Sequence, residues 1–400
     1  MPALAQGAAK IVVIGGGFGG ASCARALRQL DPELQVTLVE PNAVFTACPM
    51  SNEVIAGDRS LDTQYFTSDT IAADGIVVVA QLATQIDAQA KTIGLADGSA
   101  LGYDRLILSP GIDLRFDALT GYDEAAAEKM PHAWKAGAQT LLLRKQLEAM
   151  EDGGVVAICA PANPFRCPPG PYERASLIAH YLKTTKPRSK LLILDAKDTF
   201  SKQRLFQAAW KDLYPGIVEW VSLSQGGAVT SVDPATNTLR TDFATYKVQV
   251  ANVIPPQRAG RIAQSAGVAD KSGWCPIDPV TFEARQVPNI HVIGDACIGG
   301  AMPKSAFAAN VQAKTCAAAV VALLSGETPV TPKLINTCYS LVAPDYGISV
   351  AGVYAPKNGL LADIDGAGGT SPLDASHEVR AREAHYAHNW FDTITGEVFG

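Results

Sequence analysis

The sequence lacks several patterns that would place it in familiar classes of protein. It has no Cys-x-x-Cys pair, which argues against thioredoxin-like motifs and zinc ribbons, so we expect no metal site. It has no block of basic residues, and its formal net charge is −6, so nothing indicates nucleic-acid binding. No unbroken apolar run approaches the ~20 residues of a membrane helix. The longest, Cys316 to Leu324, suggests the buried side of a helix. We therefore expect no membrane insertion.

What is present indicates an α/β enzyme. A chain of 400 residues predicts two or three domains, and 48% hydrophobic residues suffice for sizeable cores. The 35 Gly and 25 Pro indicate many tight turns. The segment Met1 to Ala9 fits equally well the remnant of a cleaved export signal and an ordinary cytoplasmic start.

The first forty residues have the pattern of a dinucleotide-binding βαβ unit. Lys10 to Ile14 reads as a buried strand, a glycine-rich turn follows, and Ala21 to Leu30 is helical. Gln35 to Val39 is a second strand, and Glu40 ends it. This order, with an acid about 20 residues after the last glycine, is far more specific than the glycines alone. The sequence therefore predicts a bound dinucleotide.

Each glycine of this turn has an expected role. Gly15 makes the tight turn, Gly17 lets the backbone approach a pyrophosphate, and Gly20 lets the helix pack closely on the strand. The helix N-terminus then directs free N–H groups at the phosphates. Glu40 is placed to accept hydrogen bonds from the ribose hydroxyls.

Strand and helix patterns alternate along most of the chain. We expect strands at residues 76–80, 105–108, 155–159, 191–194, 218–221 and 289–293, and helices at 138–150 and 304–324. Residues 331–400 show short β-like runs, a loose stretch at 355–376 and a polar end.

Two residues late in the chain fit a flavin site. Asp295 follows the strand at 289–293, where flavoproteins with two dinucleotide domains place an Asp on the ribityl chain and diphosphate of FAD. The helix beginning near Lys304 would point its N-terminus at the N1–C2=O edge of the flavin. The alternatives are a turn or cap role for Asp295 and a solvated charge for Lys304.

The second α/β region lacks the glycines that a nicotinamide dinucleotide needs. After Val155 to Cys159 comes a loop that includes Phe165 to Pro171. Its prolines stand where glycines would let the backbone approach a pyrophosphate, and they remove N–H donors. The nicotinamide site is therefore expected to be lost, and the stiff loop presents Cys167 instead.

The chain resembles the flavoprotein subunit of flavocytochrome c sulfide dehydrogenase, in the wider group of sulfide:quinone reductase-like flavoproteins. The resemblance runs the full length. It is carried by segments 11–20, 48–55, 165–173, 273–276, 291–297, 302–305 and 336–340. It implies two Rossmann-like domains of the disulfide-reductase flavoprotein type plus a C-terminal α+β domain. The expected divisions are 1–115 with 251–330 for FAD, 116–250 for the second domain, and 331–400.

The resemblance also implies roles for three cysteines. Cys48 matches the residue attached covalently to the flavin 8α-methyl carbon. Cys167 and Cys338 match a redox-active disulfide beside the isoalloxazine ring. The alternatives are an unmodified thiol at Cys48 and structural or unpaired thiols at the other two.

The remaining cysteines have simpler interpretations. Cys23 and Cys316 lie in expected helices and Cys159 in an expected strand, so all three should be core residues. Cys275 and Cys297 are either paired or plain buried thiols.

The function implied is sulfide oxidation by FAD and this disulfide. Hydrosulfide attacks one sulfur and leaves a persulfide and a thiolate. Arg166 would supply a positive field and Glu173 would handle the proton. A surface charge and a first-turn helix residue are the alternatives.

The partner implied is a c-type cytochrome subunit or another small periplasmic electron carrier. The chain has no Cys-x-x-Cys-His motif of its own, so any haem lies on another polypeptide. Trp390 lies on the route to that partner or anchors the last strand. The compartment implied is the periplasm, where disulfides persist.

Two other functions stay open: a sulfide:quinone reductase, and a flavin-binding electron-transfer subunit without sulfide chemistry. Elemental sulfur and polysulfide both remain possible products. Two departures from the family pattern concern the flavin. Phe307 stands where a tyrosine is expected, and Phe45 to Ala47 differs before Cys48.

Overall fold

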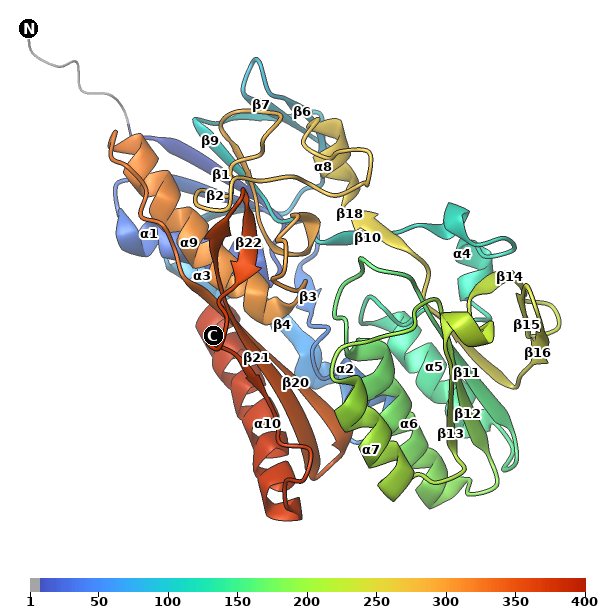
Figure 1. The fold of residues 1–400 in the computed structure, drawn as a ribbon. Helices are drawn as coiled ribbons and strands as arrows, with labels where there is room; N and C mark the ends of the chain where they lie inside the picture. The colour runs from blue at the N-terminus through green and yellow to red at the C-terminus, as the bar shows by residue number, and fades with distance from the viewer. Residues whose placement is uncertain (1–7) are drawn as a thin grey trace, which may run out of the picture.

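The computed structural model describes residues 8–400, so most of the segment Met1 to Ala9 lies outside it. Figure 1 shows two α/β regions side by side, with the C-terminal strands and the long helix α10 against the first. Most predicted strands and helices are confirmed, with ends that differ by a few residues.

The first α/β region contains a parallel five-stranded sheet in the order β19-β9-β1-β2-β5. Its apolar strands are buried because helices α1 (Phe18–Leu30) and α9 (Ala306–Leu324), which contact each other, help to cover the sheet. β19 comes from far along the chain, so this sheet is assembled from two separated segments. The strands are β1 (Lys10–Ile14), β2 (Gln35–Val39), β5 (Val77–Val79), β9 (Arg105–Leu108) and β19 (Ile290–Val292).

The second α/β region has a parallel sheet in the order β13-β12-β11-β17. The strands are β11 (Val155–Ala160), β12 (Lys190–Asp195), β13 (Val218–Val221) and β17 (Val250–Val253), and the helices are α5 (Ala138–Ala149), α6 (Gly170–Thr185) and α7 (Gln203–Leu213). β17 straddles the expected division at 250/251 and belongs to this second sheet. The antiparallel pair β10 (Ile112–Leu114) and β18 (Gln257–Ala259) lies where the chain passes between the regions.

The C-terminal region differs from the expectation of short strands and a polar end. β20 (Leu334–Ala343) and β21 (Tyr346–Lys357) form a long antiparallel pair, which β22 (Leu360–Asp363) and β23 (Gly369–Thr370) extend. The chain then ends in the 23-residue helix α10 (His377–Phe399). Trp390 therefore lies in this helix and not in a last strand.

Helix α10 was missed because its first half is polar and the large apolar side chains of its buried stripe begin only at Phe391. Buried side chains recur at the three- and four-residue spacing of a helix, at Ala384, Ala387, Phe391, Ile394 and Val398. This stripe packs on β20, β21 and α1.

Helix α9 combines an unusual length with an apolar composition. It has 19 residues and a mean hydropathy of 1.5, so by length and composition it could cross a membrane, although no unbroken apolar run is that long. Half of that stretch is buried inside the structure, where α9 packs on α1 and β20. In this fold it is a core helix.

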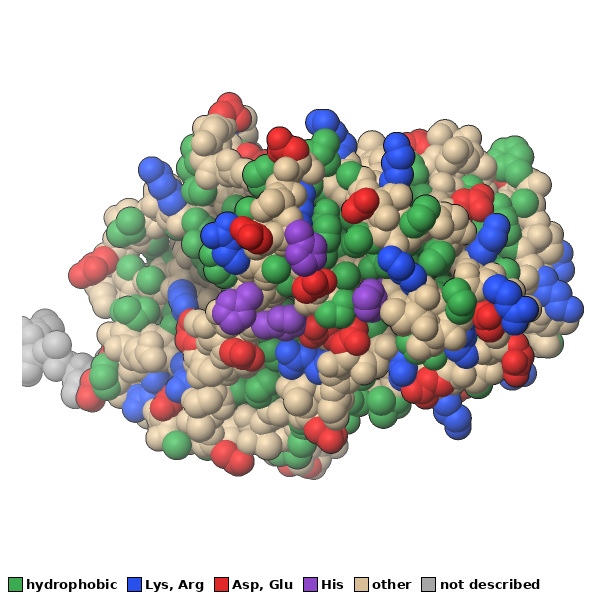
Figure 2. Space-filling view, turned by 90° about the horizontal axis from the view of Figure 1, so that it is seen from below, with side chains coloured by type: hydrophobic (Ala, Val, Ile, Leu, Met, Phe, Trp, Pro, Cys, Tyr) green, Lys and Arg blue, Asp and Glu red, His purple; other side chains and the backbone are tan. Residues whose placement is uncertain are grey.

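Smaller elements complete the described residues. The strands are β3 (Val44–Thr46), β4 (Tyr65–Thr67), β6 (Ala83–Asp87), β7 (Thr92–Leu95), β8 (Ala100–Gly102), β14 (Val229–Asp233), β15 (Thr238–Thr241) and β16 (Thr245–Lys247). The short helices are α2 (Ser51–Ala56), α3 (Asp69–Ala73), α4 (Glu124–Ala127) and α8 (Arg261–Ser265). On the face seen in Figure 2, acidic and basic side chains are interspersed and histidines gather near the middle.

Candidate flavin and disulfide site

A cavity of about 550 Å³ is lined by residues from all three regions. Eight of the ten predicted site residues line it: Gly15, Gly17, Glu40, Cys48, Cys167, Glu173, Asp295 and Cys338. Gly20 and Lys304 do not. Segments spread over 320 residues of sequence thus meet at one site.

The glycine turn lies at one end of this cavity and leaves little room for side chains. A Cβ on Gly15, whose φ is +102°, would lie 2.3 Å from the carbonyl oxygen of Ser109. A Cβ on Gly20 would lie 1.8 Å from the carbonyl oxygen of Gly15, so the start of α1 leaves no room for a side chain there. Gly17 precedes α1, and no side chain in the described part of the chain caps this helix end. The first N–H groups of α1 therefore suit a diphosphate.

Glu40 lies at the end of β2, as predicted. Its Oε2 accepts a hydrogen bond from the Gly16 N–H at 2.7 Å, and its Oε1 accepts from the backbone and side-chain N–H groups of Asn42. These bonds fix the carboxylate at the cavity edge.

Asp295 follows β19, a strand of the same sheet as β1, and lines the cavity in a setting that suits a polar ligand. Burial raises the pKa of its carboxyl group, although the charges of Arg166 and Lys304 oppose that effect. Its Oδ2 lies 3.9 Å from Arg166 Nη1. Its Oδ1 is buried and has no hydrogen-bond partner within residues 8–400. Because such an atom is costly to leave unpaired, a bound hydroxyl group would satisfy it.

Lys304 lies just before helix α9 and not in its first turn. Helix α9 begins two residues later, at Ala306, and Ser305 caps it. The ammonium group of Lys304 donates to the carbonyl oxygens of Asp295 (2.8 Å) and Cys297 (2.7 Å) and lies 4.0 Å from the centre of the Trp274 ring. Burial lowers its pKa. Lys304 is thus neither a solvated charge nor a cavity-lining group: it fixes the turn that carries Asp295.

Cys48 lines the cavity and is partly buried. Its Sγ lies 4.0 Å from the carbonyl oxygen of Trp134. The guanidinium of Arg166 donates to the same carbonyl. Burial would lower the pKa of Arg166, but the influence of Cys48 and Asp295 outweighs it and raises that pKa. Arg166 is therefore a charge inside the site and not on the surface.

Cys167 and Cys338 face this cavity from different regions, the first in the proline-rich loop and the second on β20. Both are free thiols in the structure. The Cys167 N–H donates to the carbonyl oxygen of Lys304 at 2.8 Å, which ties the loop to the segment before α9. Burial raises the pKa of the Cys167 thiol, and nearby Glu173 and Cys338 raise it further.

Glu173 lies on the first turn of α6 and is held on both sides. Its Oε1 accepts from the Leu341 N–H at 3.0 Å and its Oε2 from Asn52 Nδ2 at 3.1 Å. Burial raises the pKa of its carboxyl group. A partly buried carboxylate with a raised pKa is suited to take up a proton.

Sequence reasoning assigned no role to Arg174, although its side chain lines the cavity. It is only 2% exposed and donates to Asn52 Oδ1, Asn252 Oδ1 and the carbonyl oxygens of His132 and Ala133. Burial lowers its pKa to about 10. No signal in the sequence separates this arginine from a surface residue, because its partners come from three distant segments.

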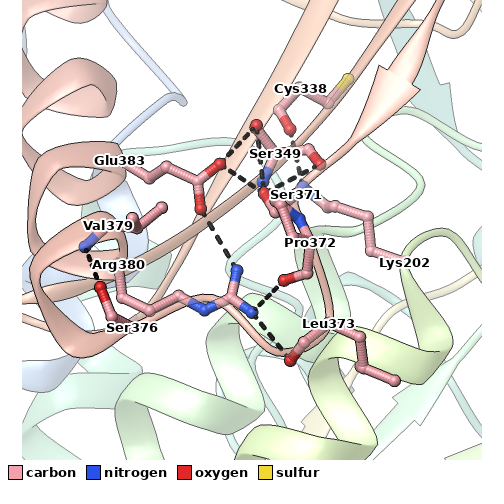
Figure 3. A network of polar contacts seen from close by, with 10 residues as sticks. All are labelled: Lys202, Cys338, Ser349, Ser371, Pro372, Leu373, Ser376, Val379, Arg380 and Glu383. Atoms are coloured by element: carbon pink, nitrogen blue, oxygen red, sulfur yellow. Dashed lines mark hydrogen bonds and ion pairs between the residues drawn. The ribbon is translucent and has the colours of Figure 1, made fainter.

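Lys202 was also missed. Its ammonium donates to the carbonyl oxygen of Cys338 (2.7 Å; Figure 3) and to Ser340 Oγ (2.8 Å). Burial lowers its pKa, while Cys338, Glu173 and Cys167 favour the charged form. The Lys202 ammonium group therefore lies on the backbone of Cys338, close to both thiols.

The other cysteines occupy the places that the sequence predicted. Cys23, Cys159 and Cys316 are buried in α1, β11 and α9. Cys275 and Cys297 are buried neighbours joined by a β-bridge, and both are free thiols.

An aromatic group lines the cavity beside β20. Phe307 stacks on Trp390 with ring centres 6.1 Å apart, and Tyr339 lies 6.3 Å from the same indole. All three line the cavity. Phe307 is thus part of this wall even though a tyrosine was expected there.

These features fit a bound FAD. The open helix end suits its diphosphate, Glu40 suits its ribose, and the orphaned Asp295 Oδ1 suits a hydroxyl of its ribityl chain. Among the described residues there is no cluster of side chains that could hold a metal ion.

Three family profiles match successive parts of the chain. Residues 9–143 match pyridine nucleotide-disulphide oxidoreductases. Residues 140–255 match the central part of the sulfide dehydrogenase (flavocytochrome c) flavoprotein chain, and residues 330–399 match the flavin-binding part of flavocytochrome c sulphide dehydrogenase.

Individual relatives agree. The sulfide dehydrogenase (flavocytochrome c) flavoprotein chain of Chlorobaculum thiosulfatiphilum is 60% identical over 48 residues, which are 12% of this chain and all of that sequence. The mitochondrial sulfide:quinone oxidoreductase of Mus musculus is 22% identical over 76% of this chain and 69% of its own length. The solved sulfide:quinone oxidoreductase of Aquifex aeolicus has a TM-score of 0.76 at 18% identity, covering 98% of this chain and 92% of that one, which establishes the shared fold.

Fold and site together define a flavoprotein with the two-domain architecture of the disulfide oxidoreductases. Its flavin-binding region supports FAD as the cofactor. More particularly, the chain belongs to the family of flavocytochrome c sulfide dehydrogenase flavoprotein chains, which are sulfide-oxidising flavoproteins.

Proposed function

We propose that this protein oxidises hydrosulfide through a disulfide between Cys167 and Cys338 and passes the electrons singly to a c-type cytochrome subunit. The observation that carries the proposal is that both cysteines line the same cavity as the glycine turn and Asp295. A sulfur pair in that position would share the cavity with a flavin whose diphosphate the turn would hold. The names of the matching families support the cytochrome partner.

In the proposed reaction, hydrosulfide attacks one sulfur of the disulfide. A new S–S bond forms, the Cys167–Cys338 bond breaks, and the other cysteine leaves as a thiolate. Glu173 takes the proton of the resulting persulfide, and Lys202 and Arg166 stabilise the negative sulfur. The disulfide re-forms as zero-valent sulfur leaves. FAD, when bound, accepts the two electrons that sulfide gives up.

Covalent attachment of FAD at Cys48 is part of the proposal. Cys48 lines the cavity, and the Arg166 guanidinium donates to the same Trp134 carbonyl oxygen that lies beside Cys48 Sγ. We also propose a periplasmic location, because the mechanism needs a disulfide that is not reduced by cellular thiols.

Flavin absorbance near ~450 nm, followed without oxygen, tests the proposal. We expect sulfide, but not NADH, to bleach it, and added oxidised cytochrome c to restore it. The Cys167→Ser and Cys338→Ser variants should keep their flavin and lose bleaching by at least about 1,000-fold in rate. Cys159→Ala removes a buried thiol outside the cavity and serves as the matched control. Bleaching by NADH alone, or by sulfide in both serine variants, would refute the disulfide reaction.

A further inference from the structure

The two sulfurs at the site have different hydrogen-bonding environments. Asn336 Nδ2 donates to Cys338 Sγ at 3.2 Å. Within residues 8–400, no hydrogen bond reaches Cys167 Sγ; that residue is held through its backbone N–H instead. A hydrogen-bond donor stabilises negative charge that develops on a sulfur, and of the two sulfurs only that of Cys338 has such a donor within the described residues.

The donating amide has a fixed orientation. Ser305 Oγ accepts a hydrogen bond from the Ala308 N–H at the start of α9, so its own proton is free to donate. It donates to Asn336 Oδ1 at 2.7 Å. With its oxygen engaged there, the amide turns its NH₂ group to Cys338. Asn336 is only 2% exposed, so water does not compete for it.

The strand places the two residues on one face, because residues two apart in a strand point the same way. Lys202 holds the same stretch of β20 through the carbonyl oxygen of Cys338 (Figure 3). The Lys202 ammonium group thus lies on the backbone side of Cys338 and makes no hydrogen bond to its sulfur.

We infer that Asn336, oriented by Ser305, is a positioning residue that makes Cys338 the more nucleophilic sulfur of the reduced pair. The consequence for turnover rests on the proposed function, because in that reaction the attack of hydrosulfide on the disulfide releases one cysteine as a thiolate. The difference between the two thiols stands whether or not sulfide is the substrate.

Differential alkylation of the reduced holoenzyme tests this inference. Limited iodoacetamide at fixed pH forms a C–S bond with loss of iodide, and peptide mass spectrometry gives the rate at each cysteine. We expect Cys338 to react faster than Cys167. Asn336→Ala should slow Cys338 about tenfold, the effect expected for one hydrogen bond to a charged group, and leave Cys167 within about twofold.

Asn336→Asp sharpens the test because it has nearly the same shape. Its second oxygen replaces the donor, so alkylation of Cys338 should slow at least as much as in the alanine variant. Ile335→Ala, at a neighbouring position that is 51% exposed, is the control. Ser305→Ala should give a smaller slowing in the same direction. Flavin content and far-UV circular dichroism confirm that each variant is folded.

Equal changes at both cysteines, or none, would overturn the inference, since they would mean that Asn336 only supports packing. Selective slowing of Cys338 in a protein that sulfide does not bleach would uphold the inference and reject the proposed function. A loss of sulfide bleaching without any change in alkylation would reject the inference alone.

Discussion

The two Rossmann-like units of this chain have the same strand–loop–helix start and opposite loop chemistry. In the first, residues 15–17 join β1 to α1, and glycine leaves the helix N-terminus open to the cavity. In the second, residues 161–169 join β11 to α6, and prolines remove N–H groups. The N–H groups of Arg166 and Cys167 are taken by Gln257 Oε1 and the Lys304 carbonyl. The first loop offers backbone donors to a ligand, and the second uses its donors to hold itself in place.

The second unit also fills the space beside its sheet. Asp195, at the end of β12, is fully buried and accepts from Tyr172 Oη (2.6 Å), Lys197 Nζ (2.6 Å) and Trp220 Nε1 (3.0 Å). Phe200 stacks on Tyr172 at 3.6 Å. In nucleotide-binding units an acid at such a strand end meets the ribose. Here its partners come from the protein itself. One architecture can therefore bind a nucleotide in one unit and, in another, supply residues that line the site of the neighbouring unit.

The largest predicted effect concerns the glycine turn of the first unit. Gly20→Ala places a Cβ 1.8 Å from the Gly15 carbonyl oxygen, so α1 must move off β1. We expect loss of bound flavin and a fall in the free energy of unfolding of about 4 kcal/mol or more. Flavin absorbance per protein and urea denaturation measure both. Gly102→Ala, where a Cβ meets nothing within 4 Å, should change neither. A Gly20→Ala protein with full flavin would contradict the close-packing argument.

The next effect concerns the proline-rich loop, which a buried aromatic ring holds. Phe165 is 2% exposed and contacts Trp134 and the ammonium of Lys197. Phe165→Ala should lower the free energy of unfolding by about 3–4 kcal/mol, through lost apolar burial and the cavity left behind. Phe243→Ala, at a ring that is 84% exposed, should change it by less than about 0.5 kcal/mol. Similar losses from both variants in thermal or urea unfolding would mean that the ring does not hold the loop.

A smaller effect is expected at Asp195, the buried acid at the end of β12 in the second unit. Lys197→Met removes the cation paired with buried Asp195, which keeps its two other donors, so we expect a loss of about 2–3 kcal/mol. Arg188→Met, in an exposed ion pair with Asp152, should cost less than about 1 kcal/mol. Adding Asp195→Asn to Lys197→Met should recover part of the loss. A double variant less stable than the sum of the single losses would argue against charge as the cause.

The smallest effect tests helix α10, which contributes Ala387 and Trp390 to the cavity lining. His388 on α10 pairs with Glu53 on α2 at 2.7 Å. The hydrogen bond to Glu53 raises the pKa of His388 above 6.5. Burial opposes ionisation of Glu53, but its bonds to His388 and Arg59 outweigh burial and lower its pKa below 4.5.

The sign of the pH dependence follows from these two shifts. The His388 contribution is complete below pH 6.5 and is lost as pH rises through its raised pKa. The Glu53 contribution is complete above pH 4.5 and is lost as pH falls through its lowered pKa. His388→Gln should therefore cost about 0.5–1 kcal/mol near pH 6 and less at pH 9. Urea unfolding at both pH values measures this, with His385→Gln as control. A cost that does not vary with pH would exclude the ion pair as its source.

Much of the fold could be predicted from local pattern. The first unit was predicted because strand, glycine turn, helix and acid follow each other within forty residues. The proline-rich loop of the second unit could be read for the same reason, since its prolines stand directly after β11, and the loss of a nicotinamide site there stays a prediction. Helix α10 was not, because its first half is polar and the buried stripe begins only near Ala384.

By itself, the sequence determined the dinucleotide turn, the proline-rich loop and the cysteines that the family resemblance singles out, because each is a local string of residues with its own geometry. Only the tertiary structure decided that Arg174 and Lys202 lie buried at the site and that Lys304 turns away to hold the Asp295 turn. It also decided that Asn336 donates to Cys338 Sγ, whereas no donor in residues 8–400 reaches Cys167 Sγ. The physical reason is that a charged or amide side chain takes its role from its partners. Here those partners come from segments that only folding brings together.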